Sequence, residues 1–165
     1  MTANLLPNAA LAYTKFSAWT VAKTGSATAP TATYSATTGP NSTPGLTLGS
    51  SGTSGGVELT YQLSLSNTDS GVLVVSAIIK GSSASANSTP IQVVFQDGVT
   101  PTPNTVVSYV PYADGTYADT AAHLYVAVAP IPVGAVQAEI ILGYTHWSST
   151  GGYTAVVSSP AVYQL

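Results

Sequence analysis

Residues 57–81 read "VELTYQLSLSNTDSGVLVVSAIIKG", and this stretch decides the fold class. In 57–65, apolar Val, Leu and Tyr residues alternate with Glu, Thr, Gln and Ser, which is the two-residue period of a β-strand with one face in water. Residues 71–81 are apolar on both faces, and they predict a strand that is central in its sheet or covered on both sides. The Asn, Asp, Ser and Gly residues of 67–71 are typical of the turn between them.

The remainder of the chain repeats this strand–turn pattern and shows no convincing 3.6-residue period. Runs rich in Pro, Gly, Asp and Asn separate the apolar segments, as expected for turns. We therefore predict an all-β chain, a jelly-roll β-sandwich of about seven to nine antiparallel strands. The further strands are predicted at 18–24, 31–37, 90–96, 105–112, 123–130, 135–147 and 153–165.

The domain organisation follows from the length of 165 residues, which suits one domain with a substantial core. We predict a single jelly-roll domain over 1–165. Residues 38–56, "TGPNSTPGLTLGSSGTSGG", are rich in Gly, Ser, Thr and Pro and are predicted to be a flexible loop, or an arm that reaches a neighbouring subunit.

The charge content excludes several classes of function. The chain has three lysines, no arginine and six acidic residues, too few cations to neutralise phosphates, so binding to nucleic acid or to an anionic membrane surface is not expected. With no cysteine it can form neither a disulfide nor a thiolate metal site. The longest apolar run, 72–79, is too short to cross a bilayer.

The surface chemistry favours a protein that works in an assembly. A monomer normally keeps itself in solution with mixed surface charge, and this chain combines very few charges with a positive mean hydropathy. We expect some apolar surface to be covered by other subunits, in a homo-oligomer for which a trimer is the working hypothesis. The N-terminus has no basic region followed by a long apolar run, so no signal peptide is expected. Release by host lysis, as for a phage virion protein, fits that pattern.

Three segments carry a resemblance to a known superfamily. "NLLPNAALA" (4–12) followed by "SAWT" (17–20), "GVLVVSAIIKGSS" (71–83) and the closing stretch 135–165 resemble galactose-binding-like jelly rolls of the carbohydrate-binding-module type. The resemblance implies a jelly-roll fold in which Trp19 is buried. Domains of this type also occur in phage tail fibres, baseplates and capsid-decorating proteins.

The resemblance does not extend to the family's calcium site. In many of these modules the last strand carries an acidic pair that helps to hold a structural calcium, whereas "VSSPAVYQ" (157–164) has no carboxylate. The position of a sugar-binding cleft is not implied either, because family members place it differently.

Catalysis and metal binding find little support in the residues. A glycosidase needs two carboxylates that flank a bond, but the acidic residues are scattered, and Asp97, Asp114 and Asp119 lie in turn sequences. His123 and His146 with nearby serines show no nucleophile elbow. We predict a chain that is not an enzyme, with no cofactor. Asp114 and Asp119 in "DGTYAD" are weak calcium candidates, and a plain hairpin connection is the favoured interpretation.

Aromatic residues are the best candidates for contact with a ligand or partner. The chain has ten tyrosines against two phenylalanines, and a Tyr or Trp ring combines an apolar face with a polar tip that suits both sugars and subunit interfaces. The alternative is that several of these rings belong to the core. The candidates gather at two loops: Tyr109, Tyr112, Tyr117, Trp147 and Tyr153.

Regular alternation along 135–147 is expected to separate the two neighbours His146 and Trp147. Tyr144 and His146 would share the face of Ile140 and Leu142, and Trp147 would lie on the opposite face. Their adjacency in the sequence is therefore no evidence of a joint site.

Three functional hypotheses follow. The leading one is a non-enzymatic structural protein of a phage virion, a capsid decoration or cement protein or a fibre component. It would attach to itself and to other virion proteins, such as the major capsid protein, through apolar and hydrogen-bonded contacts. The alternative is a carbohydrate-binding module, free or displayed on a virion, that recognises glycans through Tyr and Trp platforms. A hydrolase or lyase with a site in the sandwich groove is the third, weakened by the scarcity of convergent acids and bases.

Assembly of this chain is expected to depend only weakly on ionic strength, because few charges are available for salt to screen. Sedimentation velocity from low salt to about molar salt checks this expectation. Dissociation of the assembly by molar salt would contradict attachment through apolar and hydrogen-bonded contacts.

Overall fold

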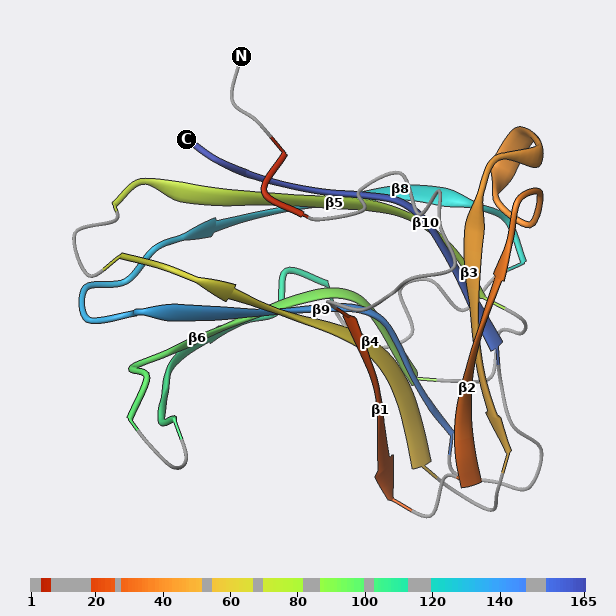
Figure 1. The fold of residues 1–165 in the computed structure, drawn as a ribbon, viewed down its shortest axis with the longest axis horizontal. Helices are drawn as coiled ribbons and strands as arrows, with labels where there is room; N and C mark the ends of the chain where they lie inside the picture. The colour runs from red at the N-terminus through yellow and green to blue at the C-terminus, as the bar shows by residue number, and fades with distance from the viewer. Residues whose placement is uncertain are drawn as a thin grey trace.

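The computed structural model describes residues 4–6, 19–25, 28–51, 55–66, 70–81, 87–99, 103–112, 120–147 and 154–165. Two antiparallel sheets of five strands each face one another, as Figure 1 shows. Sheet A has the order β1 (Trp19–Gly25), β4 (Gly55–Ser64), β9 (Gln137–Trp147), β6 (Asn87–Gln96), β7 (Thr105–Tyr109). Sheet B has the order β2 (Thr28–Ser35), β3 (Gly45–Ser51), β10 (Thr154–Gln164), β5 (Val72–Gly81), β8 (His123–Pro130).

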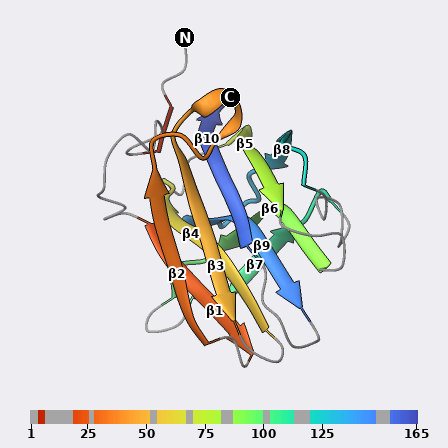
Figure 2. The same cartoon turned by 90° about the vertical axis from the view of Figure 1, so that its right-hand side faces the viewer.

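The connections between strands are those of a jelly roll. Among the described strands, only β2–β3 and β6–β7 are consecutive strands that also pair, and every other step along the chain leads to the opposite sheet. Figure 2 shows the result in sheet B, where the C-terminal strand β10 lies beside β3. The predicted fold class, an all-β jelly-roll sandwich, is confirmed. The described part of the chain contains no helix with the length and hydropathy needed to span a bilayer.

One hydrophobic core lies between the sheets, and the alternation of the strands builds it. In β5, Leu73, Val75, Ala77 and Ile79 are buried, and β5 lies between β10 and β8, as its apolar sequence predicted. The largest side chains that are fully buried are Phe95, Leu46, Leu48, Leu59, Leu73, Ile79, Ile91, Ile140 and Leu142.

Trp19 belongs to this core, as the resemblance implied. Its side chain is 7% exposed, and its ring centroid lies 5.3 Å from that of Tyr61 on the paired strand β4.

Residues 4–6 of the N-terminal motif close the edge of β10. The N–H of Leu5 donates to the carbonyl of Val162 at 2.8 Å, and the N–H of Val162 donates to Oδ1 of Asn4 at 3.0 Å. Leu6 is 6% exposed and joins the core. Since β3 pairs with β10 only as far as Val157, this segment occupies the edge that β3 leaves.

The prediction of a loop over 38–56 is wrong for residues 45–51 and 55–56, which lie in strands. Strand β3 (Gly45–Ser51) pairs with both β2 and β10, and Leu46 and Leu48 are fully buried. A 3₁₀ turn, Pro40–Ser42, precedes it. The local composition resembles a loop because only two apolar side chains stand among Gly, Ser and Thr. Hydrogen bonds on both edges supply the stability that local propensity lacks. The described residues therefore form ten strands, more than the sequence predicted.

The prediction of one continuous alternation along 135–147 is also wrong. Gly143 has a φ of +65°, and the register between β4 and β9 shifts by one residue beside it. Leu142 pairs with Leu59, but Thr145 pairs with Val57 and His146 with Gly56. A β-bulge of this kind breaks the two-residue period, so the faces of Tyr144 and His146 do not follow from that of Leu142. The side chains of 145–147 lie outside the described residues.

Gly143→Ala is expected to lower the free energy of unfolding by about 2–4 kcal/mol, through strain at positive φ and overpacking of the core. A Cβ at this position would lie 2.8 Å from Cγ2 of Val157, in the core. Urea unfolding measures the change.

Gly134→Ala is the matched control, because Gly134 also has a positive φ, 88°, but no described atom lies within 4 Å of its added Cβ. It should cost only about 1 kcal/mol. Equal losses in the two variants would contradict the packing role of Gly143.

Candidate functional site

The structure places the first two aromatic candidates against the sandwich. Tyr109 ends β7 opposite Val93, whose side chain is in the core, and both Tyr109 and Tyr112 are half-buried and packed against that core. The ring of Tyr112 makes an edge-on contact with that of Tyr125, with centroids 5.3 Å apart. Its hydroxyl hydrogen-bonds to the backbone of Val126. These two rings therefore have structural contacts that account for much of their surface.

The remaining candidates stay predictions. Tyr117, Tyr153 and the calcium candidates Asp114 and Asp119 lie outside the described residues. Trp147 ends β9 opposite Gly55, and its side chain is likewise outside the description. Within the described ranges, no three His, Asp or Glu side chains gather closely enough to hold a metal ion.

Asp97 has the turn role that its position in "DG" predicted. Its carboxylate accepts hydrogen bonds from the side-chain amide of Asn104 at 2.9 Å, from the Asn104 N–H at 2.9 Å and from the Val99 N–H at 3.0 Å. These bonds, the one from the Asn104 side chain foremost, hold the pKa of Asp97 below its usual value. This carboxylate closes the hairpin between β6 and β7.

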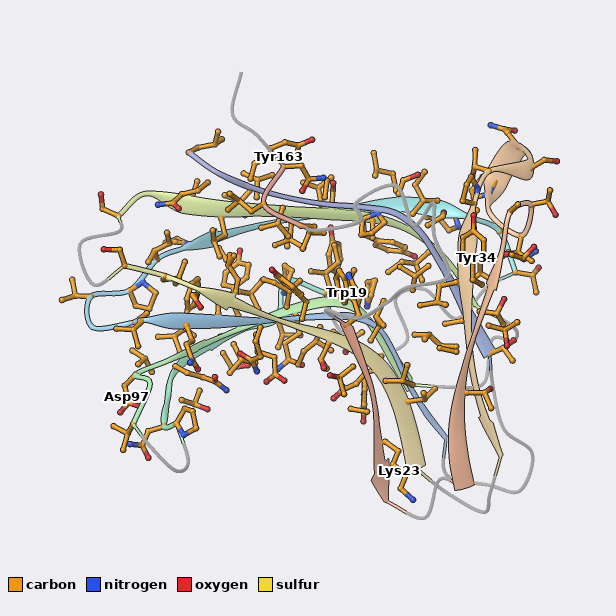
Figure 3. All side chains as sticks on the ribbon, in the orientation of Figure 1. Trp19, Lys23, Tyr34, Asp97 and Tyr163 are labelled. Atoms are coloured by element: carbon orange, nitrogen blue, oxygen red, sulfur yellow. The ribbon has the colours of Figure 1, made fainter. Side chains whose placement is uncertain are left out.

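A polar surface runs across the middle strands of sheet A, on the side away from the core. We call it the outer face of sheet A, and it consists of the residues that alternate with the buried ones along β1, β4, β9, β6 and β7. In Figure 3 it lies below the lower sheet, between the turn at Asp97 and the end of β1 near Lys23. Its members are Thr20, Ala22, Glu58, Thr60, Gln62, Ser64, Gln137, Glu139, Ile141, Gln92, Val94, Gln96 and Ser108.

The strand register arranges these side chains in rows. Ser64, Gln137 and Gln96 form one row, because each pairs with the next across β4, β9 and β6. The adjacent row consists of Gln62, Glu139, Val94 and Ser108. Such rows place amide, hydroxyl and carboxyl groups side by side, about 5 Å apart, as neighbouring strands require.

Contacts within the face keep it compact. Nε2 of Gln92 donates to Oγ of Ser108 at 2.8 Å, and Oγ1 of Thr60 donates to the carbonyl of Thr20 at 3.3 Å. Ile141, although it belongs to this face, is only 6% exposed, so the surrounding polar side chains cover it. The face is therefore a polar layer that covers Ile141.

Two carboxylates share this face. Partial burial raises the pKa of Glu58 above its ordinary value, and the nearby charge of Glu139 raises the pKa of Glu58 further. Glu58 and Glu139 come from the paired strands β4 and β9. Because like charges near one another disfavour ionisation, this face is adverse to an anionic ligand.

The outer face of sheet A is open. The described residues enclose no pocket. An open polar face of this kind can contact an extended ligand along several residues, but it cannot surround a small one.

The fold defines a class: a β-sandwich jelly roll similar to those of carbohydrate-binding modules among solved structures, the fold that the resemblance implied. No protein-family model matches the chain, and no curated protein matches it. Likeness is found among solved structures, at identities that show the fold alone.

Three of these structures illustrate the likeness. The tailspike protein 4 enzymatically active domain of bacteriophage CBA120 has a TM-score of 0.69 and 16% identity over 98% of this chain, which spans 21% of the tailspike chain. TmCBM61, solved with β-1,4-galactotriose, has a TM-score of 0.56 and 13% identity over 99% of this chain and 100% of its own. The CBM22-1 xylan-binding domain of Paenibacillus barcinonensis Xyn10C has a TM-score of 0.59 and 12% identity over 90% of this chain and 86% of its own.

Sequence reasoning did not single out the outer face of sheet A. A signal was present, because Glu58, Thr60, Gln62 and Ser64 alternate with apolar residues as the wet face of one strand. The glutamines of 90–96 and 135–147 gave no reason to join them to that strand. Only the strand order β4–β9–β6 brings the three sets together.

Glu58→Gln is expected to stabilise the protein at neutral pH and to have little effect in acid. A raised pKa means that the folded protein holds the proton more tightly than the unfolded chain does. The stability contributed by protonated Glu58 is complete below the ordinary value of 4.5 and is lost as the pH rises through the folded-state pKa. Urea midpoints of wild type and variant from acid to neutral pH measure this divergence.

Asp97→Asn is expected to lower the free energy of unfolding at neutral pH and to have little effect in acid. Because the pKa of Asp97 is lowered, the stability contributed by its carboxylate is present above the ordinary value of 3.8 and is lost as the pH falls through the folded-state pKa.

For Glu58→Gln, a difference in urea midpoint from wild type that does not change with pH would contradict the assignment of the raised pKa to burial and to the charge of Glu139.

Proposed function

We propose that this chain is a non-catalytic glycan-binding module and that the outer face of sheet A is its binding surface. The observation that carries the proposal is the set of paired rows of amide, hydroxyl and carboxyl side chains on an open sheet face. The fold supports it, since the neighbours include TmCBM61 with β-1,4-galactotriose and a xylan-binding domain.

The chemistry of these rows suits a sugar. Each glutamine amide both donates and accepts hydrogen bonds, and so does each pyranose hydroxyl, so one side chain can engage two adjacent hydroxyls. Gln62, Gln137 and Gln92 lie on the adjacent strands β4, β9 and β6, in three successive rows, so an extended chain of sugars that crosses these strands can reach all three amides. Val94, which is partly exposed on the same face, supplies apolar contact for the C–H face of a ring.

The ligand is expected to be neutral. The chain has only three lysines and no arginine, and Glu58 and Glu139 lie on the proposed surface. An anionic polysaccharide would meet carboxylates without cations to balance them. A neutral glycan meets hydrogen-bonding groups only.

Display on a phage virion is the second candidate, and the tailspike neighbour favours it. That likeness covers 98% of this chain, which corresponds to about a fifth of the tailspike chain. A glycan-binding module and a virion component are compatible functions. The capsid-decoration role, the homo-oligomer and the capsid-protein partner stay predictions from composition.

Binding is tested with an array of neutral oligosaccharides, followed by calorimetry on the best ligand. Gln62→Ala and Gln92→Ala should each weaken binding by about 5–10-fold, because a net hydrogen bond contributes about 1 kcal/mol. Gln164→Ala is the matched control, since it removes the same amide from β10 in sheet B, where Nε2 donates to the carbonyl of Ser70.

The array also separates this surface from the aromatic loops. If Trp147→Ala or Tyr109→Ala abolishes binding while the glutamine variants bind normally, the site lies at the loops and not on the outer face of sheet A. Absence of binding to every neutral glycan would overturn the proposed function itself.

A further inference from the structure

Strand β8 forms one of the two edges of sheet B, and the side chain of Tyr112 occupies the middle of that edge. β8 pairs with β5 on one side only. The N–H of Val126 donates to the hydroxyl oxygen of Tyr112 at 2.8 Å, and the same hydroxyl donates to the carbonyl of Val126. One hydroxyl therefore satisfies both backbone groups, as a residue of a neighbouring strand would do.

The neighbouring outward positions on this edge belong to Leu124 and Val128. In an antiparallel ladder alternate residues direct their N–H and C=O groups away from the paired strand. Since the groups of Val126 point to Tyr112, those of Leu124 and Val128 point to the same free edge. The part of the chain that the structure describes offers those outward groups no partner.

The edge is self-complementary. A second β8 that runs antiparallel about a two-fold axis at Val126 would place Val126 opposite its own copy and Leu124 opposite Val128. The side chain of Leu124 is 66% exposed, that of Val126 44% and that of Val128 48%. The pairing would therefore bring apolar side chains of one copy against apolar side chains of the other. No Lys, Arg, Asp or Glu lies in 123–130, so no like charges oppose this approach.

We propose that Tyr112 is an edge guard: its hydroxyl keeps β8 from pairing with β8 of a second copy of this chain. The hydroxyl occupies the centre of the register, where the second strand's own N–H and C=O would bind Val126. Both cannot occupy that place at once. Exposed strand edges are sites of unwanted association, and proteins commonly block them.

The ring holds the hydroxyl in place. Tyr112 packs edge-on against Tyr125, whose side chain is 6% exposed in the core. Pro130 at the far end of β8 lacks an N–H, which limits an intruding strand to the 124–128 register. A group that blocks this pairing must therefore lie at the middle of 124–128, and the Tyr112 hydroxyl is bound there, to Val126. This inference is independent of the proposed glycan binding.

Tyr112→Phe tests the proposal, because it keeps the ring and removes only the hydroxyl. Sedimentation equilibrium over a range of protein concentrations is expected to show a species of twice the wild-type mass. Tyr109→Phe is the matched control, which loses a hydroxyl from the neighbouring segment and should retain the wild-type mass. Circular dichroism confirms that each variant is folded.

A second substitution locates the contact. Val126→Lys in the Tyr112→Phe background would place two like charges directly opposite each other at the two-fold axis, and it should restore the wild-type mass. A folded Tyr112→Phe with the wild-type mass at every concentration would overturn the proposal. Association that Val126→Lys fails to reverse would overturn it as well, since the contact would then lie elsewhere than the β8 edge.

Discussion

The contact between the inner faces of the two sheets is the interaction on which the structure depends. Leu59, Phe95 and Ile140 from sheet A and Leu48 and Ile79 from sheet B are fully buried in one core. Each such side chain contributes about 1.5–3 kcal/mol through its removal from water. With three lysines and no arginine, the chain has little electrostatic stabilisation to add. Apolar burial between the sheets therefore bears most of the stability, and it fixes which face of every strand points outward.

The two outer surfaces follow from this constraint, and they differ in chemistry. On sheet A most outward residues of β4, β9 and β6 carry amides, hydroxyls or carboxylates, and they pack closely enough that partial burial raises the pKa of Glu58. On sheet B the outward residues of β8 are Leu124, Val126 and Val128, beside an edge closed at its middle by Tyr112. The same sandwich thus carries one surface suited to hydroxyl-rich ligands and one edge protected against strand addition.

The positions of most strands could be predicted because alternation and turn residues are local signals. Strand β3 was not predicted, because two leucines among glycines and serines give too weak a local pattern. Its stability comes from pairing with β2 and β10 on either side. The side-chain orientations near the end of β9 could not be predicted from local alternation, because the bulge at Gly143 depends on the core, where Val157 leaves no room for a side chain. The aromatic candidates gave a partial account: Tyr112 proved to hold a strand edge, a role no spacing rule indicates.

The sequence by itself determined the fold class, the turn role of Asp97 and the shortage of cations that disfavours anionic ligands. These follow from residue type and near-neighbour spacing, since alternation, turn chemistry and charge act over a few residues. Only the tertiary structure decided which glutamines and glutamates share a face, and which hydroxyl caps β8. Both depend on strand order, and that order is set by how the two sheets bury their apolar faces together.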